Sequence, residues 1–247
     1  NTALGASAMG SNTTGSYNVA IGSEDASGYP PLYRNTTGAS NIAIGNGSLA
    51  KNTTASNNTA VGQSALYANT TGTQNVAVGG LALNDNTTAS LNTAIGYSAL
   101  KSTTTGASNT AVGLNALVDN TTGARNTASG QQALTANTTA SDNTAFGYQS
   151  LLANTTGTQN VAVGALALDA LTDADNNVAL GYLSLSADTL GSRSVAVGSH
   201  ALTAQNFTSA TDTYNTAVGF FAGISVTTGI QNTLIGGLAG DAFTEAS

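Results

Sequence analysis

The stretch "NTAVGQSALYANTTGTQ", residues 58 to 74, is followed directly by "NVAVGGLALNDNTTASL", residues 75 to 91, and this repetition decides the fold. Each copy opens with Asn, a β-branched residue, Ala, an apolar residue and Gly. A fixed short period of this kind predicts a repeat array and argues against a globular α/β domain. The period is 17, except for longer intervals of 23 after Asn18 and 21 after Ser194. The fourteen pentads begin at Asn1, Asn18, Asn41, Asn58, Asn75, Asn92, Asn109, Asn126, Asn143, Asn160, Asn177, Ser194, Asn215 and Asn232.

The residues of each repeat favour strands and turns over helices. Every repeat contains Gly, and Asn, Thr and Ser fill most other positions, all of which are poor helix formers. The pentad predicts a strand of about five residues that ends at Gly62, and residues 65 to 71 predict a second short strand before Gly72 turns the chain. Two strands and two turns make one coil, so the sequence predicts an all-β parallel β-solenoid of about fourteen coils over residues 1–247, as a single repeat domain.

In such a solenoid equivalent side chains stack from coil to coil. Thirteen of the fourteen pentads begin with Asn, and we expect its amide to satisfy backbone groups at a corner. The predicted amide ladder includes Asn58, Asn75, Asn92 and Asn109, and the predicted apolar ladder includes Leu66, Leu83, Leu100 and Leu117.

The pentad is apolar on both faces of its strand. In one interpretation Ala60 lines a narrow interior, and Thr59 and Val61 face neighbouring chains; in the other, positions two and four of the pentad fill a monomeric core and Ala faces water. An exposed row of Val, Ile and Leu would form a large adhesive patch. The sequence therefore predicts a homo-oligomer.

The pentads resemble the YadA-like head repeats of trimeric autotransporter adhesins, and the "NTAxGxxAL…NTTG" pattern is similar to arrays in phage and bacterial tail-fibre-domain proteins. The resemblance covers nearly the whole chain. It implies a left-handed β-roll, three chains side by side, and exposure on a cell or virion surface. We therefore expect an extracellular segment of a longer fibre protein.

Two insertions interrupt the period, and inserted loops are where recognition can reside. The first, residues 24–34, contains both prolines of the chain, and its Tyr29, Tyr33 and Arg34 are candidate contacts for a sugar or a protein. Its alternative role is to fold back over the roll or a neighbouring chain. The second, residues 203–214, follows the sole histidine, His200, which has no catalytic partners in the sequence and is expected to be a surface residue.

Other recurring side chains have two interpretations. Aromatic residues follow the pentad Gly at Tyr97, Tyr148, Tyr182 and Phe220, and we expect local packing there in preference to a continuous binding stripe. Eight Asn residues fit the N-x-[ST] glycosylation pattern, and the alternative to a glycan is an unmodified ladder of Asn and Thr. These candidate acceptors are Asn12, Asn35, Asn52, Asn69, Asn86, Asn120, Asn137 and Asn154.

Composition argues against several functions. Charged residues make up 7% of the chain and the net charge is -7, with no basic stripe for nucleic acid. No apolar run is long enough to cross a membrane, and there is no cysteine to bind metal or form a disulfide. Asp169, Asp173 and Asp175 lack the motif of calcium-binding rolls. We expect no cofactor and no enzymatic activity, because solenoid enzymes need charged residues paired across neighbouring coils.

Two functions remain from the sequence. The first is a structural and adhesive fibre segment that contacts itself and a cell-surface glycan or protein, with a glycosylated extracellular filament as a variant of it. The second is an ice-binding solenoid, which requires outward ranks of Thr. Against it, the pentad Thr alternates with Val or Ile, and the N-T-T row is interrupted at Thr103, Leu171, Asp188 and Val226.

Overall fold

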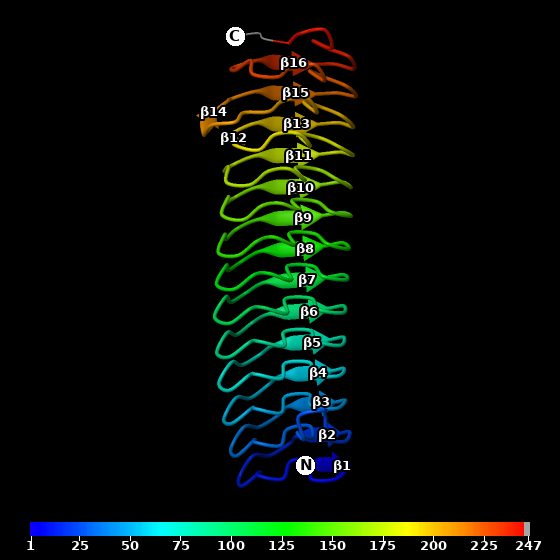
Figure 1. The fold of residues 1–247 in the computed structure, drawn as a ribbon, viewed down its shortest axis with the longest axis vertical. Coiled ribbons are helices and arrows are strands. Elements are labelled where there is room, and N and C mark those ends of the chain that lie inside the picture. The colour runs from blue at the N-terminus through cyan, green and yellow to red at the C-terminus, as the bar shows by residue number, and fades with distance from the viewer. Residues whose placement is uncertain (245–247) are drawn as a thin grey trace. The chain divides into compact units, whose positions relative to one another are not determined.

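The computed structural model describes residues 1–244, and these residues are all-β, with no helix among them. The chain divides into two compact units, Asn1–Ala124 and Arg125–Ser247, and each is described by itself. Within each unit the chain winds as a parallel β-solenoid, with one short strand in each regular turn (Figure 1). The predicted fold class and repeat are confirmed, with about fourteen turns in all.

The main strands of each unit are three residues long and pair in parallel with the strand of the next turn. The first unit contains β1 (Thr2–Leu4), β2 (Val19–Ile21), β3 (Ile42–Ile44), β4 (Thr59–Val61), β5 (Val76–Val78), β6 (Thr93–Ile95) and β7 (Thr110–Val112). The second contains β8 (Thr127–Ser129), β9 (Thr144–Phe146), β10 (Val161–Val163), β11 (Val178–Leu180), β13 (Val195–Val197), β15 (Thr216–Val218) and β16 (Thr233–Ile235), with a small sheet of β12 (Gly191–Ser192) and β14 (Thr211–Asp212).

The strand register decides which face is interior. Ala60 pairs with Ala77 in the next turn, and both are fully buried. Thr59 and Val61 on either side of Ala60 are only partly buried, as expected for alternation along a strand. The inner face is therefore the one given by the first interpretation of the pentad: Ala lines the interior, and positions two and four face outward. Small side chains are required there because the interior is narrow.

Leucine fills the other side of the interior. Leu66, Leu83, Leu100 and Leu117 are fully buried in consecutive turns, as the predicted apolar ladder requires. Removing these side chains from water is a main source of stability, at about 25 cal/mol per Å² of apolar surface. The second unit has an equivalent buried column, made of Leu134, Leu151, Leu168, Leu185 and Leu202.

In the coils that keep both the pentad Asn and the N-T-T Asn, the two side chains bond to one carbonyl, as the coil that begins at Asn58 shows. The Nδ2 atoms of Asn58, which opens a coil, and of Asn69, which opens its N-T-T turn, each donate to the Gly72 carbonyl at 2.9 Å. The Asn58 Oδ1 atom accepts from the backbone N–H of Asn75 in the next turn at 3.0 Å. Buried polar groups need such partners, so the predicted corner role of the pentad Asn is confirmed. Most of its bonds go to the backbone and not from amide to amide.

The pentad strand is three residues long and not five, because a side-chain hydrogen bond ends it on one side and the backbone conformation of Gly ends it on the other. The backbone N–H of Asn58 bonds to the Oδ1 atom of Asn41 and not to a neighbouring backbone. Gly62 has φ +137°, and a Cβ there would lie 2.6 Å from the carbonyl carbon of Gly79. Only Gly fits this conformation and this close approach.

The predicted second strand over residues 65–71 is wrong. Ser64 and Leu66 adopt φ values of 53°, in the left-handed region, so the backbone curls instead of extending. The coils are nevertheless bonded to one another here, because the Leu66 N–H donates to the Ala82 carbonyl at 2.9 Å and Ala68 donates to Asn84 at 2.9 Å. This segment is therefore a series of turns and not a strand.

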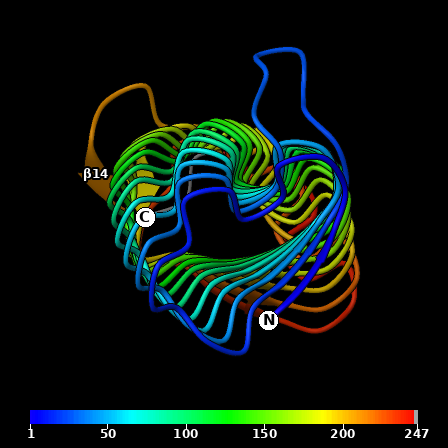
Figure 2. The ribbon, with the colours of Figure 1, turned by 90° about the horizontal axis from the view of Figure 1, so that it is seen from below.

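Both insertions leave the regular coil. Seen along the stack, the blue loop of the first insertion projects from the first unit, and the orange loop beside β14 projects from the second (Figure 2). Of the three candidate contact residues, Tyr29 lies in the inserted loop, where its carbonyl accepts from the Asp25 N–H at 3.0 Å. Tyr33 and Arg34 lie in the regular coil, because the Ser11 N–H donates to the Tyr33 carbonyl and the Arg34 N–H donates to the Ala50 carbonyl, both at 3.1 Å.

Candidate functional site

The first insertion is a closed loop that is fixed to its own unit. The Asp25 carboxylate accepts from the backbone N–H groups of Ser27 and Tyr29, each at 2.9 Å. Pro30 and Pro31 are buried behind it. These bonds lie within the insertion and give the loop a fixed shape where it projects from the coil (Figure 2).

The structure brings the three predicted contact residues together. The Tyr29 and Tyr33 rings lie 5.8 Å apart, and the Arg34 guanidinium lies 5.2 Å from the centre of the Tyr29 ring while donating to its hydroxyl at 3.0 Å. Tyr67 packs edge-on against Tyr29 at 6.2 Å, and the Lys51 ammonium lies 4.7 Å above the Tyr67 ring. We call these five residues the tyrosine cluster.

Tyr67 and Lys51 were missed from the sequence. They belong to the two regular coils after the insertion, and only the stacking of coils places them beside Tyr29. The repeat period could have identified them, because Lys51 lies one period of 17 residues after Arg34, and Tyr67 lies two periods after Tyr33. Burial raises the pKa of Tyr67, and the Asp25 carboxylate adds to this increase, whereas a hydrogen bond with Ser27 opposes it.

Contacts within the tyrosine cluster already cover part of the surface that a partner could bind. Cation–π contacts occupy a face of Tyr29 and of Tyr67. Arg34 remains exposed and Tyr33 is partly exposed. A partner at this site would therefore contact the Arg34 side of the cluster and the Tyr33 ring.

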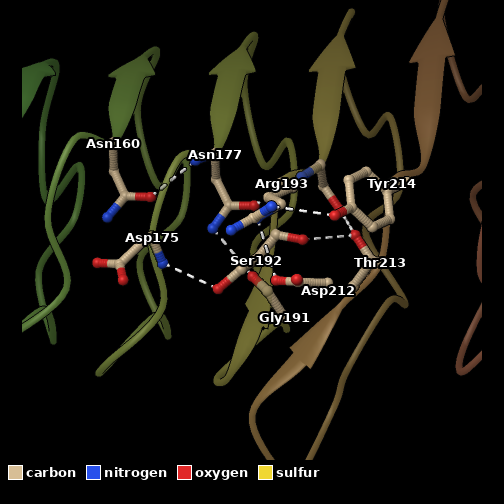
Figure 3. Close-up of polar contacts among 10 residues, drawn as sticks. Asn160, Asp175, Asn177, Gly191, Ser192, Arg193, Asp212, Thr213 and Tyr214 are labelled. Carbon is tan, nitrogen blue, oxygen red and sulfur yellow. Dashed lines mark hydrogen bonds and ion pairs between the residues drawn. The ribbon is translucent and has the colours of Figure 1, made fainter.

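An Arg–Tyr pair of the same kind joins the second insertion to the coil before it. Arg193 forms an ion pair with Asp212 at 3.1 Å and donates to the Tyr214 hydroxyl at 3.0 Å, with its guanidinium 5.6 Å from the centre of that ring (Figure 3). The Ser192 hydroxyl, from β12, accepts from the Asp175 backbone N–H at 3.0 Å. The contacts of Arg193 fasten the inserted loop to the coil before it, and the Ser192 bond joins that coil to the preceding one.

A buried carboxylate lies beneath this insertion. Asp188 occupies the place of the N-T-T Asn and is fully buried. Its oxygens accept from the Gln205 amide at 2.6 Å and from the backbone N–H groups of Gly191 at 3.0 Å and Phe207 at 3.2 Å. Burial raises the pKa of Asp188, and these donors oppose the increase.

Gln205 also makes hydrogen bonds at the single pentad that begins with Ser194 and not with Asn. Its Nε2 atom donates to the Ser194 hydroxyl at 2.9 Å, and its Oε1 atom accepts from Asn215 Nδ2 at 2.8 Å. The longer Gln side chain thus spans a gap that the shorter Ser194 leaves between the two rows of amides.

The acidic residues of the 160–176 coil are held apart by separate partners. Asp173 accepts from the Thr156 hydroxyl and Asp175 accepts from the Thr158 backbone N–H at 2.6 Å. Burial raises the pKa of Asp169. Residues 1–244 contain no group of three His, Cys, Asp or Glu side chains placed to hold a metal ion, and they enclose no pocket.

His200 lies among aromatic rings of the second unit. Its ring stacks on Phe221 at 4.7 Å and meets the edge of Tyr182 at 5.4 Å, and its Nδ1 atom is 2.9 Å from the Ser199 hydroxyl. The aromatic side chains that follow the pentad Gly are about half exposed, at 57% for Tyr97 and 49% for Tyr182. Two of them also pack locally, because the Tyr182 ring meets His200 and the Phe220 ring meets Phe221 at 4.2 Å.

Seven of the eight candidate glycosylation sites point into the coil. The Asn52 Nδ2 atom donates to Asn35 Oδ1 at 2.8 Å and to the Ala55 carbonyl at 3.0 Å, so both of its hydrogens are used. A glycan on such a nitrogen would break one of these bonds and would have no room in the interior. The ladder is therefore the observed arrangement, and it argues against glycans on the buried residues. Asn12 is partly exposed. The seven fully buried residues are Asn35, Asn52, Asn69, Asn86, Asn120, Asn137 and Asn154.

Comparison with known proteins adds no relative: no family model, no curated protein and no solved structure matches the chain. The fold itself defines the class, a parallel β-solenoid repeat protein. In the part of the chain that the structure describes, no helix is long and apolar enough to cross a membrane.

Proposed function

We propose that the chain is a structural and adhesive segment of an extracellular fibre, on a cell surface or virion, and that it assembles with copies of itself as a side-by-side trimer of left-handed β-rolls. One observation carries this proposal. Apolar side chains at the fourth pentad position form an outward row on consecutive turns of the first unit, with Val78 at 36%, Ile95 at 42% and Val112 at 37% exposure.

Such a row favours a partner with the same period. The backbones of neighbouring turns are joined by parallel pairing, so the outward side chains repeat at about 4.8 Å along the stack. A second copy presents the same repeat and can match it turn after turn, whereas an irregular surface matches only locally. Burying the row between copies removes an apolar patch from water.

Solution mass tests the assembly. Light scattering should give three times the chain mass of 24.2 kDa. Ile95→Asp places a charge in the proposed interface and should yield folded monomers, and Thr105→Asp, at an exposed position outside the strand face, should keep the trimer. A monomeric mass for the unmodified chain would contradict the proposal.

The tyrosine cluster is the proposed contact of this segment with a cell-surface glycan or protein. Tyr33→Ala removes a ring that is partly exposed and should reduce binding to the target surface without changing the melting temperature. Tyr17→Ala, at a ring that is 82% exposed and outside the cluster, serves as the control. Unchanged binding by the Tyr33 variant would remove the cluster from the proposal.

Ice binding is the second candidate, and the exposed Thr pairs of the first unit favour it. The second Thr of N-T-T is exposed in seven consecutive turns: Thr14, Thr37, Thr54, Thr71, Thr88, Thr105 and Thr122. The first Thr is held in place, since Thr53 Oγ1 donates to the Thr70 carbonyl at 3.1 Å and Thr70 Oγ1 to the Thr87 carbonyl at 3.0 Å. Of the interruptions in the N-T-T row, only Thr103 lies in the first unit, and it occupies the buried position, so it does not break this outer rank. A thermal-hysteresis assay tests it, and zero hysteresis would eliminate it.

A further inference from the structure

We propose that three exposed rings of the second unit, those of Tyr148, Tyr182 and Phe220, bind an extended, neutral β-1,4-linked polysaccharide. We call these three residues the aromatic rank. The site is separate from the tyrosine cluster and from the outward row of the first unit. It requires neither the trimer nor the fibre role proposed above.

The aromatic rank alternates with small residues. Each ring directly follows a pentad Gly, in the turns that begin at residues 143, 177 and 215, and the intervening turns carry Ala165 and Ser199 at the same position. The exposed fractions are 46% for Tyr148, 49% for Tyr182 and 58% for Phe220. The two intervening turns therefore carry no ring at this position.

The spacing of the rings is fixed by the backbone. Strands β9, β10, β11, β13 and β15 pair in unbroken register. The bonding continues past the Gly, where the Leu166 N–H donates to the Tyr148 carbonyl and the His200 N–H donates to the Tyr182 carbonyl, both at 2.9 Å. Successive rings therefore stand two turns apart, which is about 9.5 Å.

This spacing suits a β-1,4-linked chain of sugars. In such an extended chain, each sugar advances by nearly the length of one solenoid turn, and successive sugars are turned over, so every second sugar presents the same face. The C–H face of a sugar packs on an aromatic ring, whose edge and hydroxyl remain available to water. Three rings two turns apart would therefore stack the first, third and fifth sugars.

The neighbouring residues select a neutral ligand. Between Phe146 and Phe221, the residues at the last two pentad positions and the two positions after them include no Lys, Arg, Asp or Glu. The polar groups beside the rings are those of Gln149, Ser199 and His200, which can exchange hydrogen bonds with sugar hydroxyls. A charged polysaccharide would find no opposite charge on this face.

Titration calorimetry on the purified full chain tests the site with cellohexaose as the probe. Cellobiose, which can cover only one ring, and maltohexaose, whose α-linkages curve the chain, are the ligand controls. The variants are Tyr182→Ala, which removes the central ring, and Tyr182→Phe, which keeps it. Tyr97→Ala is the matched control, because Tyr97 occupies the same place in a turn of the first unit that has no ring two turns away, at Gln63 or Gln131.

We expect cellohexaose to bind at least tenfold more tightly than either control sugar. Tyr182→Ala should weaken binding about tenfold, the loss expected on removing one stacked ring, and Tyr182→Phe and Tyr97→Ala should leave it within about twofold. Equal binding of maltohexaose, an unaffected Tyr182→Ala variant, or no binding of cellohexaose would overturn the proposal. If cellohexaose does not bind and Tyr182→Ala lowers the solution mass, the aromatic rank is a contact between copies and not a sugar site. If cellohexaose does not bind and the unmodified chain is still a trimer, the sugar site is refuted while the proposed assembly stands.

Discussion

The Oδ1 atom of Asn86 accepts no hydrogen bond from any described residue, because the equivalent position one turn later is Thr103 and not Asn. Elsewhere in this unit the bond is made: Asn86 Nδ2 itself donates to Asn69 Oδ1 at 2.9 Å. The side chain of Thr103 is fully buried but carries no amide to donate back. The row of amides is therefore interrupted at one turn.

Restoring that amide should stabilise the protein. Thr103→Asn gives Asn86 a donor and should raise the free energy of unfolding by about 1 kcal/mol, the usual net value of a buried hydrogen bond. Urea denaturation measures the change, and Thr105→Asn, at an exposed position of the same turn, should have little effect. A loss of stability in Thr103→Asn would show that the site has no room for the amide.

The pentad glycine should tolerate no side chain. Gly62→Ala places a Cβ 2.6 Å from the carbonyl carbon and oxygen of Gly79 and forces Ala to φ +137°. Strain of this kind costs on the order of 1–3 kcal/mol before the clash is counted. Thermal unfolding should show a large loss for Gly62→Ala and a small change for Gly80→Ala, since Gly80 lacks this φ and Ala165 already occupies the equivalent position.

The buried leucine column should be the most costly place to create a cavity. Leu100→Ala should lower the free energy of unfolding by about 2–5 kcal/mol, and Leu100→Asp should prevent folding, because a carboxylate would be buried among apolar side chains without a partner. Chemical denaturation followed by circular dichroism measures both. If Leu100→Asp keeps the original melting temperature, the stacked core is wrong.

Replacing an exposed leucine that adopts a left-handed conformation should increase the stability of the protein. Leu91 has φ 64° and is 55% exposed, whereas Asn57 and Asn176 occupy the equivalent position with φ 61°. The left-handed conformation costs a branched residue roughly 1–2 kcal/mol, and Asn relieves part of this cost. Leu91→Asn should raise the melting temperature, and Leu114→Asn, at an exposed Leu outside this conformation, should not.

The buried Asp188 predicts a pH dependence. Its pKa is raised in the folded state, above all by burial, so the folded protein binds more protons than the unfolded chain between the two pKa values. Its contribution to stability is therefore greatest below the unfolded value of about 3.9 and is lost as the pH rises through the folded value. Asp188→Asn removes this titration.

Denaturation from pH 3 to 8 measures the effect. The stability of Asp188→Asn relative to the unmodified chain should increase with pH over this window and then become constant, whatever its value at pH 3. Asp119→Asn, at an exposed residue, controls for the change in net charge. A difference that falls with rising pH would reverse the direction assigned to the pKa of Asp188.

Several elements of the fold could be predicted because each is repeated at a fixed period. The pentad marked the position of every main strand, and the repeated Ala, Leu and Asn identified the rows of side chains that stack from turn to turn. The turn after Gly62 could not be predicted in the same way, because Leu66 and Ser64 are ordinary residues in a left-handed conformation that their side chains do not favour. Contacts between coils, through the Leu66 and Ala68 N–H groups, hold them there.

The candidate site was only partly predictable. The first insertion placed Tyr29, Tyr33 and Arg34 close together in sequence, and they are close in space. Tyr67 and Lys51 join them from regular coils that lie after the insertion in the chain. The N-x-[ST] pattern indicated accessible Asn residues, whereas coil stacking turns seven of these amides inward.

The sequence by itself determined the repeat, the parallel solenoid and the rows of Ala, Leu and Asn, because a constant period requires equivalent side chains to meet in every turn. Only the tertiary structure decided which rows face the interior, which amides are buried and which aromatic rings remain exposed. The reason is physical: whether a side chain points inward depends on backbone dihedrals set by bonds to the neighbouring turns, and those bonds exist only once the turns are stacked.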